Sequence, residues 1–235
     1  MSLRSKYHRH ERIVRLHRAA LSHIAREGVQ GLRLNMLAKE LGYTTAALYR
    51  YYPSKEALVA ELQKNTLIRM RHALSCFLEE ALAEADMSEP LAPLLISAHF
   101  YARYAKCSPA SFALNSNIFS SHALLLHGDR RQGIIMVMRS LLEVIQDQLD
   151  DAGLSRSREG LSQAFGFWSA LYGVLLTNKY HGDFSLPNPE EVVGDLCVGW
   201  GAELSQVRQI QESISAWSNS RDLSSFTHLD SLDAL

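Results

Sequence analysis

The stretch Asn35–Glu56, NMLAKELGYTTAALYRYYPSKE, decides the fold of the N-terminal part of the chain. Its first half, NMLAKEL, is rich in helix-forming residues, and Gly42 supplies the positive φ angle that ends a helix at low cost. Thr44 is suited to cap a second short helix over Thr45–Tyr51, which Pro53 prevents from continuing. Two short helices around a glycine-containing turn predict a helix-turn-helix.

The outer surface of the predicted helix Thr45–Tyr51 decides whether it reads DNA or fills a core. At about 100° per residue, a hydroxyl, a methyl, a phenol and a guanidinium share one arc, while Leu48 falls on the opposite side. This arc has no acidic residue, and its groups suit phosphate oxygens and base edges. The alternative is a helical hairpin of an unrelated bundle whose Tyr and Arg side chains are exposed by chance. The arc consists of Thr45, Ala46, Tyr49 and Arg50.

Charge is distributed unevenly along the chain. Residues 1–55 hold eleven Lys and Arg side chains against three Asp and Glu side chains, a balance of +8. The whole chain has a formal net charge of −1, so the remainder carries −9. A basic N-terminal part on an acidic body indicates a polyanion as partner, and phosphate neutralisation would supply the affinity that does not depend on sequence.

The segment Gly28–Leu58 resembles the DNA-binding domain of the TetR family of bacterial regulators, on Leu37-Ala38, Gly42, Thr44, Leu48-Tyr49, Tyr51-Tyr52 and Lys55-Glu56. The resemblance spans residues 9–60 and implies DNA contacts from Arg33, Asn35, Thr45, Ala46, Tyr49, Arg50, Tyr51 and Lys55. For Tyr51, packing beneath the following helix is an equal alternative. The family usually begins the first helix of the motif with a capping box, where this chain has Arg33 and Met36. Arg33 cannot cap, so this helix start either frays, at a cost of about 1 kcal/mol, or brings Arg33 to a phosphate.

Nearly all the rest of the chain predicts helix, which gives an all-α protein of about nine helices. The expected helices are His8–Glu27, Ser54–Ala85, Pro90–Cys107, Pro109–Phe119, Arg130–Asp151, Glu159–Tyr180 and Pro189–Trp217, besides the two of the helix-turn-helix. We expect residues 1–55 to form a DNA-binding domain and residues 56–218 a ligand-binding and dimerisation domain. The Ser- and Asp-rich residues 219–235 are expected to be a mobile tail.

Other classes of protein find little support. The chain contains no run of 18 apolar residues and no apolar segment after its basic N-terminus, so neither a membrane span nor a signal peptide is predicted. Three widely spaced cysteines, Cys76, Cys107 and Cys197, fit neither a disulfide framework nor a zinc site and suit a reducing cytoplasm. No catalytic constellation, metal-ligand spacing or phosphate loop is recognisable, so we expect no enzyme, no metal and no cofactor.

The family resemblance implies a pocket for a small effector in the body of the protein. Aromatic and Met side chains with a few polar groups are typical of such a lining, although they equally fill helical cores. The candidates are Tyr101, Tyr104, Phe112, Asn115, Phe119, Met136, Phe165, Trp168 and Tyr172. As a set they indicate a hydrophobic or aromatic effector. The segments Tyr101–Pro109 and Phe167–Gly173 also resemble a TetR subgroup with a Trp-His-Gly signature, with Tyr172 in place of the His.

Small residues are frequent on the last two predicted helices, where they would allow close helix packing in a homodimer or, alternatively, within one chain. They are Gly166, Ala170, Gly173, Gly194, Gly199, Gly201 and Ala202. Together these features predict a cytoplasmic, ligand-responsive transcriptional regulator: a dimeric repressor released from palindromic double-stranded DNA by a small effector. A helical small-molecule-binding protein without specific DNA binding is the alternative.

Overall fold

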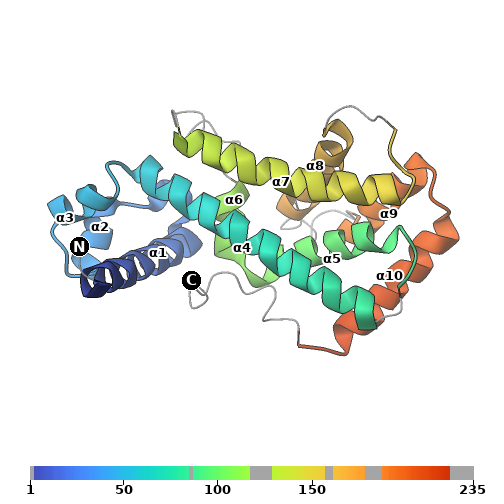
Figure 1. The fold of residues 1–235 in the computed structure, drawn as a ribbon, viewed down its shortest axis with the longest axis horizontal. Coiled ribbons are helices and arrows are strands. Elements are labelled where there is room, and N and C mark those ends of the chain that lie inside the picture. Colours follow the sequence, from blue (N-terminus) through green and yellow to red (C-terminus); the bar gives the residue numbers. More distant parts are fainter. Residues whose placement is uncertain (1–2, 85–86, 117–128, 157–160, 178–186, 223–235) are drawn as a thin grey trace. The chain divides into compact units, whose positions relative to one another are not determined.

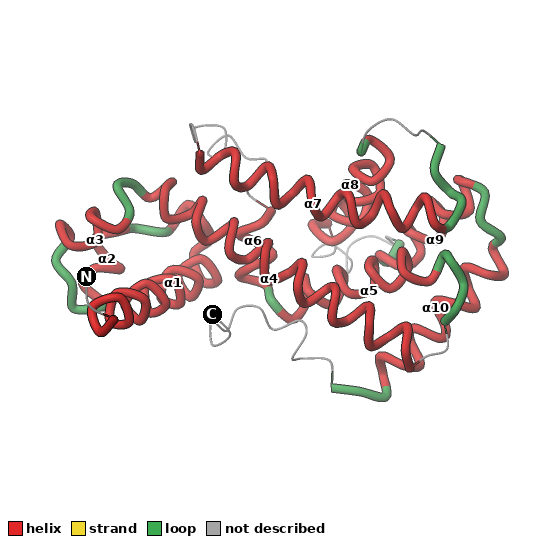
Figure 2. The backbone as a smooth tube through the Cα atoms, in the orientation of Figure 1, coloured by secondary structure: helices red, strands yellow, loops and turns green. Residues whose placement is uncertain are grey.

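The computed structural model describes residues 3–84, 87–116, 129–156, 161–177 and 187–222 (Figure 1). These residues form helices joined by short loops and no strand, which confirms the all-α fold (Figure 2). The helices are α1 (Leu3–Gly31), α2 (Leu34–Glu40), α3 (Thr45–Tyr51), α4 (Lys55–Glu84), α5 (Ala92–Cys107), α6 (Pro109–Ser116), α7 (Asp129–Asp151), α8 (Ser162–Thr177), α9 (Pro189–Trp200) and α10 (Leu204–Asn219). Within the described ranges, no helix combines the length and the apolar character that crossing a bilayer requires.

The chain divides into two compact units. Unit 1 contains α1, α2, α3, the first part of α4 up to Arg69, α6 and the first part of α7 up to Val137. Unit 2 contains the second part of α4 from Met70, α5, the second part of α7 from Met138, α8, α9 and α10. The helices α4 and α7 therefore contribute residues to both units.

Unit 1 is built around α1, which packs its apolar stripe against α2, α3 and the start of α4. Leu16, Ala20 and Ile24 of α1 are buried with Leu37 of α2 and Leu48 of α3. The buried side of α3 is thus formed by the one leucine that the helical pattern places opposite its polar arc. The first part of α1 extends beyond this core, because the side chains from Tyr7 to Arg12 are all exposed.

The turns of the helix-turn-helix form as the sequence predicts. Gly42 has a φ of 70°, and Thr44 accepts a hydrogen bond at its Oγ1 from the Ala47 amide at 3.1 Å. Ser54 likewise accepts from the Ala57 amide at 3.1 Å and caps α4. Arg33 precedes α2 without a side-chain cap, as its chemistry requires. These contacts fix where α3 and α4 begin.

One predicted helix is wrong: Pro189–Trp217 forms two helices, α9 and α10. The break lies at Gly201, whose φ of 116° ends α9 and suits a residue without a side chain. The start of α9 is fixed by a capping box between Asn188 and Glu191. The apolar periodicity runs through the break, and for this reason the sequence pattern suggested one continuous helix.

The interior of unit 2 is rich in aromatic contacts. Phe77 of α4 packs against Phe100 of α5 and Trp217 of α10, with ring centroids 5.3 and 5.1 Å apart. Arg221 binds Glu80 and Glu84 of α4 and lies over the Trp217 ring. Residues 219–222 at least are therefore attached to unit 2, whereas the rest of the predicted mobile tail lies outside the described residues.

Candidate DNA-binding surface and effector cavity

The helix α3 presents the predicted polar arc to solvent. Thr45, Ala46, Tyr49 and Arg50 are all exposed, Tyr49 to 48%, while Leu48 is fully buried. Tyr51 is only partly exposed and packs against the core of unit 1, so the packing alternative accounts for part of its surface. An exposed face that carries one guanidinium, one phenol and no acid is suited to phosphates and base edges.

Two of the other predicted DNA contacts share one hydrogen-bond acceptor. Arg33 donates to the Gln30 carbonyl oxygen at 2.6 Å, and Lys55 donates to the same oxygen at 3.0 Å. Partial burial and the neighbouring Arg33 lower the pKa of Lys55, although Glu56 opposes the shift. The shared carbonyl therefore brings Arg33, which precedes α2, close to Lys55, which begins α4. Asn35 is also exposed, and its Oδ1 accepts a hydrogen bond from the Met36 amide at 3.0 Å.

Two buried histidines of α1 hold the helix-turn-helix in place. His17 Nε2 lies 2.6 Å from the hydroxyl of Tyr52, the residue that follows α3. His23 Nε2 lies 2.7 Å from a carboxylate oxygen of Glu40, the last residue of α2. These two links could not be predicted from the sequence, whose only signal was a polar residue at two core-facing positions of α1.

A cavity lies inside unit 2, between α4, α5, α7 and α8. Its empty space is about 450 Å³ including the opening to solvent. It is lined by Met70, Leu74, Ser97, Phe100, Tyr101, Leu141, Ile145, Phe167, Trp168 and Leu171. None of these ten lining residues carries a charge. The lining is therefore suited to an apolar ligand rather than to an ion.

The polar atoms of the lining already have partners. Ser97 exchanges hydrogen bonds with Gln148 at 3.0 Å. Tyr101 is buried, which raises the pKa of its hydroxyl, and the Trp168 side chain is its hydrogen-bond partner. Trp168 in turn stacks on Tyr172 with ring centroids 5.0 Å apart. A ligand would thus meet a wall whose hydrogen-bonding groups are satisfied.

The nine predicted ligand residues do not all reach this cavity. Tyr101 and Trp168 line it, whereas Tyr172 does not line it but stacks on the Trp168 ring. Tyr104 is fully buried against Phe100 and Tyr101. Phe165 and Met136 are exposed to 43% and 62%, Phe112 and Asn115 belong to α6 in unit 1, and Phe119 lies outside the described residues. The aliphatic half of the lining, on α4 and α7, was missed because only tertiary packing brings it together.

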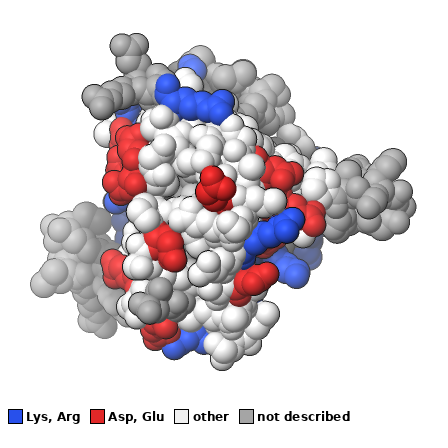
Figure 3. All heavy atoms as spheres, turned by 90° about the vertical axis from the view of Figure 1, so that its right-hand side faces the viewer, with Lys and Arg blue, Asp and Glu red and all other residues white. Residues whose placement is uncertain are grey.

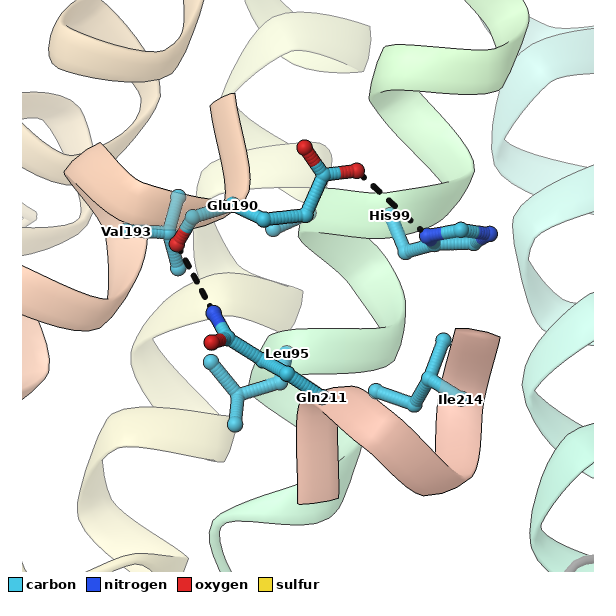
Figure 4. Close-up of a pocket in the computed structure, with 7 residues that line it drawn as sticks. Leu95, His99, Glu190, Val193, Gln211 and Ile214 are labelled. Carbon is cyan, nitrogen blue, oxygen red and sulfur yellow. Dashed lines mark hydrogen bonds and ion pairs between the residues drawn. The ribbon is translucent and has the colours of Figure 1, made fainter. Parts of the chain in front are cut away.

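Arg103 of α5 and Arg139 of α7 could pair with an acidic effector if they faced the cavity, but neither of them lines it. Arg139 is exposed and pairs with Glu143 at 2.9 Å on its own helix. Arg103 donates to Ser218 at 3.1 Å. His99 of α5 lies 3.0 Å from the same Ser218 hydroxyl. It also lies 3.5 Å from a carboxylate oxygen of Glu190 of α9 (Figure 4). His99 lowers the pKa of the Glu190 carboxyl, and Gln211 donates to the Glu190 carbonyl at 2.7 Å.

The glycines of the last helices differ in what surrounds them. A Cβ added at Gly166, Gly173 or Gly199 would meet no atom within 4 Å, so these glycines leave open surface on the protomer. A Cβ at Gly194 would instead meet Val207 at 3.2 Å, which makes this glycine a site of close packing between α9 and α10. Position 201 requires a glycine, because its φ of 116° strains a residue with a side chain. Exposed Phe165 and Leu176 accompany the open glycines on α8.

Comparison with known proteins agrees with this architecture. Residues 16–62 match the family described as bacterial regulatory proteins, tetR family. A curated relative, the nucleoid occlusion factor SlmA of Vibrio campbellii (strain ATCC BAA-1116), is 30% identical over 143 residues. The match covers 58% of this chain and 63% of the relative, so the chain spans less than two thirds of that protein's length.

Solved structures share the fold over most of the chain. A TetR-family regulator from Agrobacterium tumefaciens is 15% identical with a TM-score of 0.58, covering 84% of this chain and 97% of that one. The TetR-family regulator PfmR from Thermus thermophilus is 19% identical with a TM-score of 0.53, covering 80% and 99%. Residues 16–62, which contain the helix-turn-helix, thus match the TetR family of bacterial regulators, as the sequence motifs indicated.

Proposed function

We propose that this protein is a ligand-responsive transcriptional repressor that binds double-stranded DNA through α3 and releases it when a small apolar effector occupies unit 2. The observation that carries the proposal is the exposed arc of α3, held between capped ends on a buried leucine. Arg50 would reach a guanine edge, while Arg33 and Lys55 would bind phosphates. The face of the protein in Figure 3 has acidic and basic side chains interspersed on a largely uncharged surface.

The effector we propose is neutral and largely hydrophobic or aromatic. A desolvated anion would need a cationic partner, and the lining residues of the cavity include none. Phe100, Phe167 and Trp168 supply aromatic faces for such a molecule. Such a molecule would complete the packing between α5 and α8.

The helix α4 is the proposed connection between the two functions. It begins at Lys55, beside the helix-turn-helix, and its Met70 and Leu74 line the cavity. At 1.5 Å per residue, about 22 Å of continuous helix separates Lys55 from Met70. An effector that pushes on Met70 would shift α4 and its N-terminal end. Release then requires that the effector bind the geometry without DNA more tightly than the geometry with DNA.

A homodimer is part of the proposal, because one seven-residue helix reads too few base pairs for a unique operator. The exposed side of α8, with Phe165, Gly166, Gly173 and Leu176, offers an apolar surface without close packing in the protomer. Two-fold pairing of α8 and α9 would place two copies of α3 on successive turns of a palindromic operator.

Binding to random-sequence DNA separates this function from that of a ligand-binding protein that does not bind DNA. The full chain should bind a random duplex with an affinity that falls steeply as salt rises. Binding that is absent at low salt would leave the ligand-binding alternative as the better description.

A further inference from the structure

The first part of α1 lies outside both the family match and the core. The match begins at residue 16, whereas α1 begins at Leu3. At 1.5 Å per residue, the thirteen residues before the match correspond to about 20 Å of helix. From Tyr7 to Arg12 every side chain is exposed, so packing does not explain why this helix is there.

Arginines continue the buried stripe of α1 into this extension. At 100° per residue, Arg9 falls on the same side of the helix as Leu16 and Ala20, which are buried. Arg12 falls on the same side as Ala19, which is also buried. The acidic Glu11 points to the opposite side, where His8 lies 3.4 Å from its carboxylate. The side of the helix that is apolar further along is therefore basic here.

That side faces the helix-turn-helix. His17 of α1 contacts Tyr52 at the end of α3, and His23 contacts Glu40 at the end of α2. Moving toward the N-terminus, Arg12 and Arg9 follow His17 by about 8 and 12 Å along the axis. Figure 1 shows the start of α1 at the same end of unit 1 as α2 and α3.

We propose that the exposed N-terminal part of α1 is a second DNA-binding element, in which Arg9 and Arg12 bind the phosphate backbone next to the stretch read by α3. The inference rests on the proposed function, since it assumes that α3 faces DNA. Two guanidinium groups on one side of a helix suit phosphate oxygens, and DNA carries a phosphate charge for about every 1.7 Å of its axis. The contact adds affinity for any sequence and carries no base specificity.

The test compares the full-length protein with R9Q/R12Q and with a control of equal charge, R131Q/R208Q. The control arginines are exposed on α7 and α10, far along the chain from the helix-turn-helix. Binding to a random duplex of about 30 base pairs is measured between about 50 and 200 mM salt. Circular dichroism checks that all three proteins are equally helical.

Two phosphate contacts contribute about 1.8 to the salt slope of the binding constant. R9Q/R12Q should therefore lose about that much slope, so that over this fourfold salt range its affinity changes about twelvefold less than that of the wild type. The control variant should keep the wild-type slope.

Equal slopes for R9Q/R12Q and the control would overturn the inference while leaving DNA binding by α3 intact. A wild-type protein that does not bind the duplex at all would overturn the proposed function itself. The same proteins are also mixed with phosphatidylglycerol vesicles. If the arginines are needed for vesicle binding but leave the DNA slope unchanged, the partner of this helix is a membrane and the inference is wrong.

Discussion

The imidazole of His17 and the hydroxyl of Tyr52 are joined by a 2.6 Å hydrogen bond in the interior of unit 1. Both residues are less than a tenth exposed. The bond links α1 to Tyr52, the residue that follows α3, so it fixes α3 at its C-terminal side. Within the described part of the chain, Nδ1 of His17 has no hydrogen-bond partner, and a protonated ring would leave a buried N–H unpaired there.

Acid should destabilise the protein through His17. Burial lowers the pKa of His17 from 6.5 to about 4. Between these two pH values the imidazole is protonated in the unfolded chain and neutral in the folded chain. The stabilising contribution is complete above pH 6.5 and is lost as the pH falls toward 4, by about 3 kcal/mol in total and about 2 kcal/mol by pH 5. Urea unfolding of wild type and His17→Phe at pH 7.5 and 5 measures the difference.

The His17→Phe variant should show a smaller loss of unfolding free energy between these two pH values. Tyr52→Phe serves as the matched control: it removes the hydrogen bond, at a cost of about 1 kcal/mol, but keeps the buried histidine and its pH dependence. The same pH dependence in wild type and His17→Phe would show that another group is responsible.

Arg50 and Lys55 should differ in the kind of binding energy they supply. Arg50→Ala should weaken binding to the operator by about 1–3 kcal/mol and relax the preference at one base position of each half-site. Lys55→Ala should weaken all sequences alike and flatten the salt slope by about one unit. Titrations of operator and scrambled duplex at several salt concentrations separate the two effects. Arg50→Lys keeps the charge but loses the bidentate geometry, so it should behave like Arg50→Ala on the operator. If both sequences are weakened equally, Arg50 contacts only phosphate.

Gly173→Leu should disrupt the dimer without harming the protomer. A Cβ at this position meets no atom within 4 Å in the chain, and replacing a helical glycine favours the helix. Sedimentation at micromolar concentration should show a monomer of unchanged helicity with strongly reduced operator affinity. Gly194→Leu is the contrasting variant, because its side chain would collide with Val207 and should lower the thermal stability instead. A Gly173→Leu protein that remains dimeric would locate the interface elsewhere.

Trp168→Ala should abolish stabilisation by the effector. In a thermal-shift screen, neutral hydrophobic or aromatic compounds should raise the melting temperature, since a ligand at 100 times its Kd adds about 2.7 kcal/mol of stability. Removing Trp168 opens the cavity wall and should eliminate the shift. Ile135→Ala is the control, because Ile135 is an exposed apolar residue of α7 that does not line the cavity. Stabilisation only by acidic metabolites, lost in Arg103→Ala or Arg139→Ala, would overturn the apolar assignment.

Local patterns were enough to predict the helix-turn-helix, because its boundaries depend on neighbouring residues. Gly42, Thr44 and Ser54 act on the backbone within three residues of themselves, so their effects can be read from the sequence. The division of Pro189–Trp217 was missed because Gly201 interrupts a pattern that remains periodic on both sides. A glycine signals a possible break, but its φ angle depends on how α10 packs back onto α9.

The cavity was only half predictable. Tyr101 and Trp168 were identified by residue type, whereas Met70 and Ile145 look like any core residue until α4 and α7 are seen to meet at the same space. Met136 shows the opposite error, since a flexible apolar side chain on α7 suggested the lining and yet faces solvent. A helical pattern gives the buried side of each helix but not the neighbour that this side meets.

Selection from a pool of randomised duplex DNA with the full-length protein shows whether two copies of α3 read a specific sequence. We expect enrichment of an inverted repeat whose half-sites are centred about one helical turn apart, or a multiple of it, because a two-fold axis relates the two bound copies of α3. Each half-site should contain a position that loses its preference when Arg50 is replaced by Ala. Retention of DNA without any enriched sequence, or no retention even at low salt, would contradict the account.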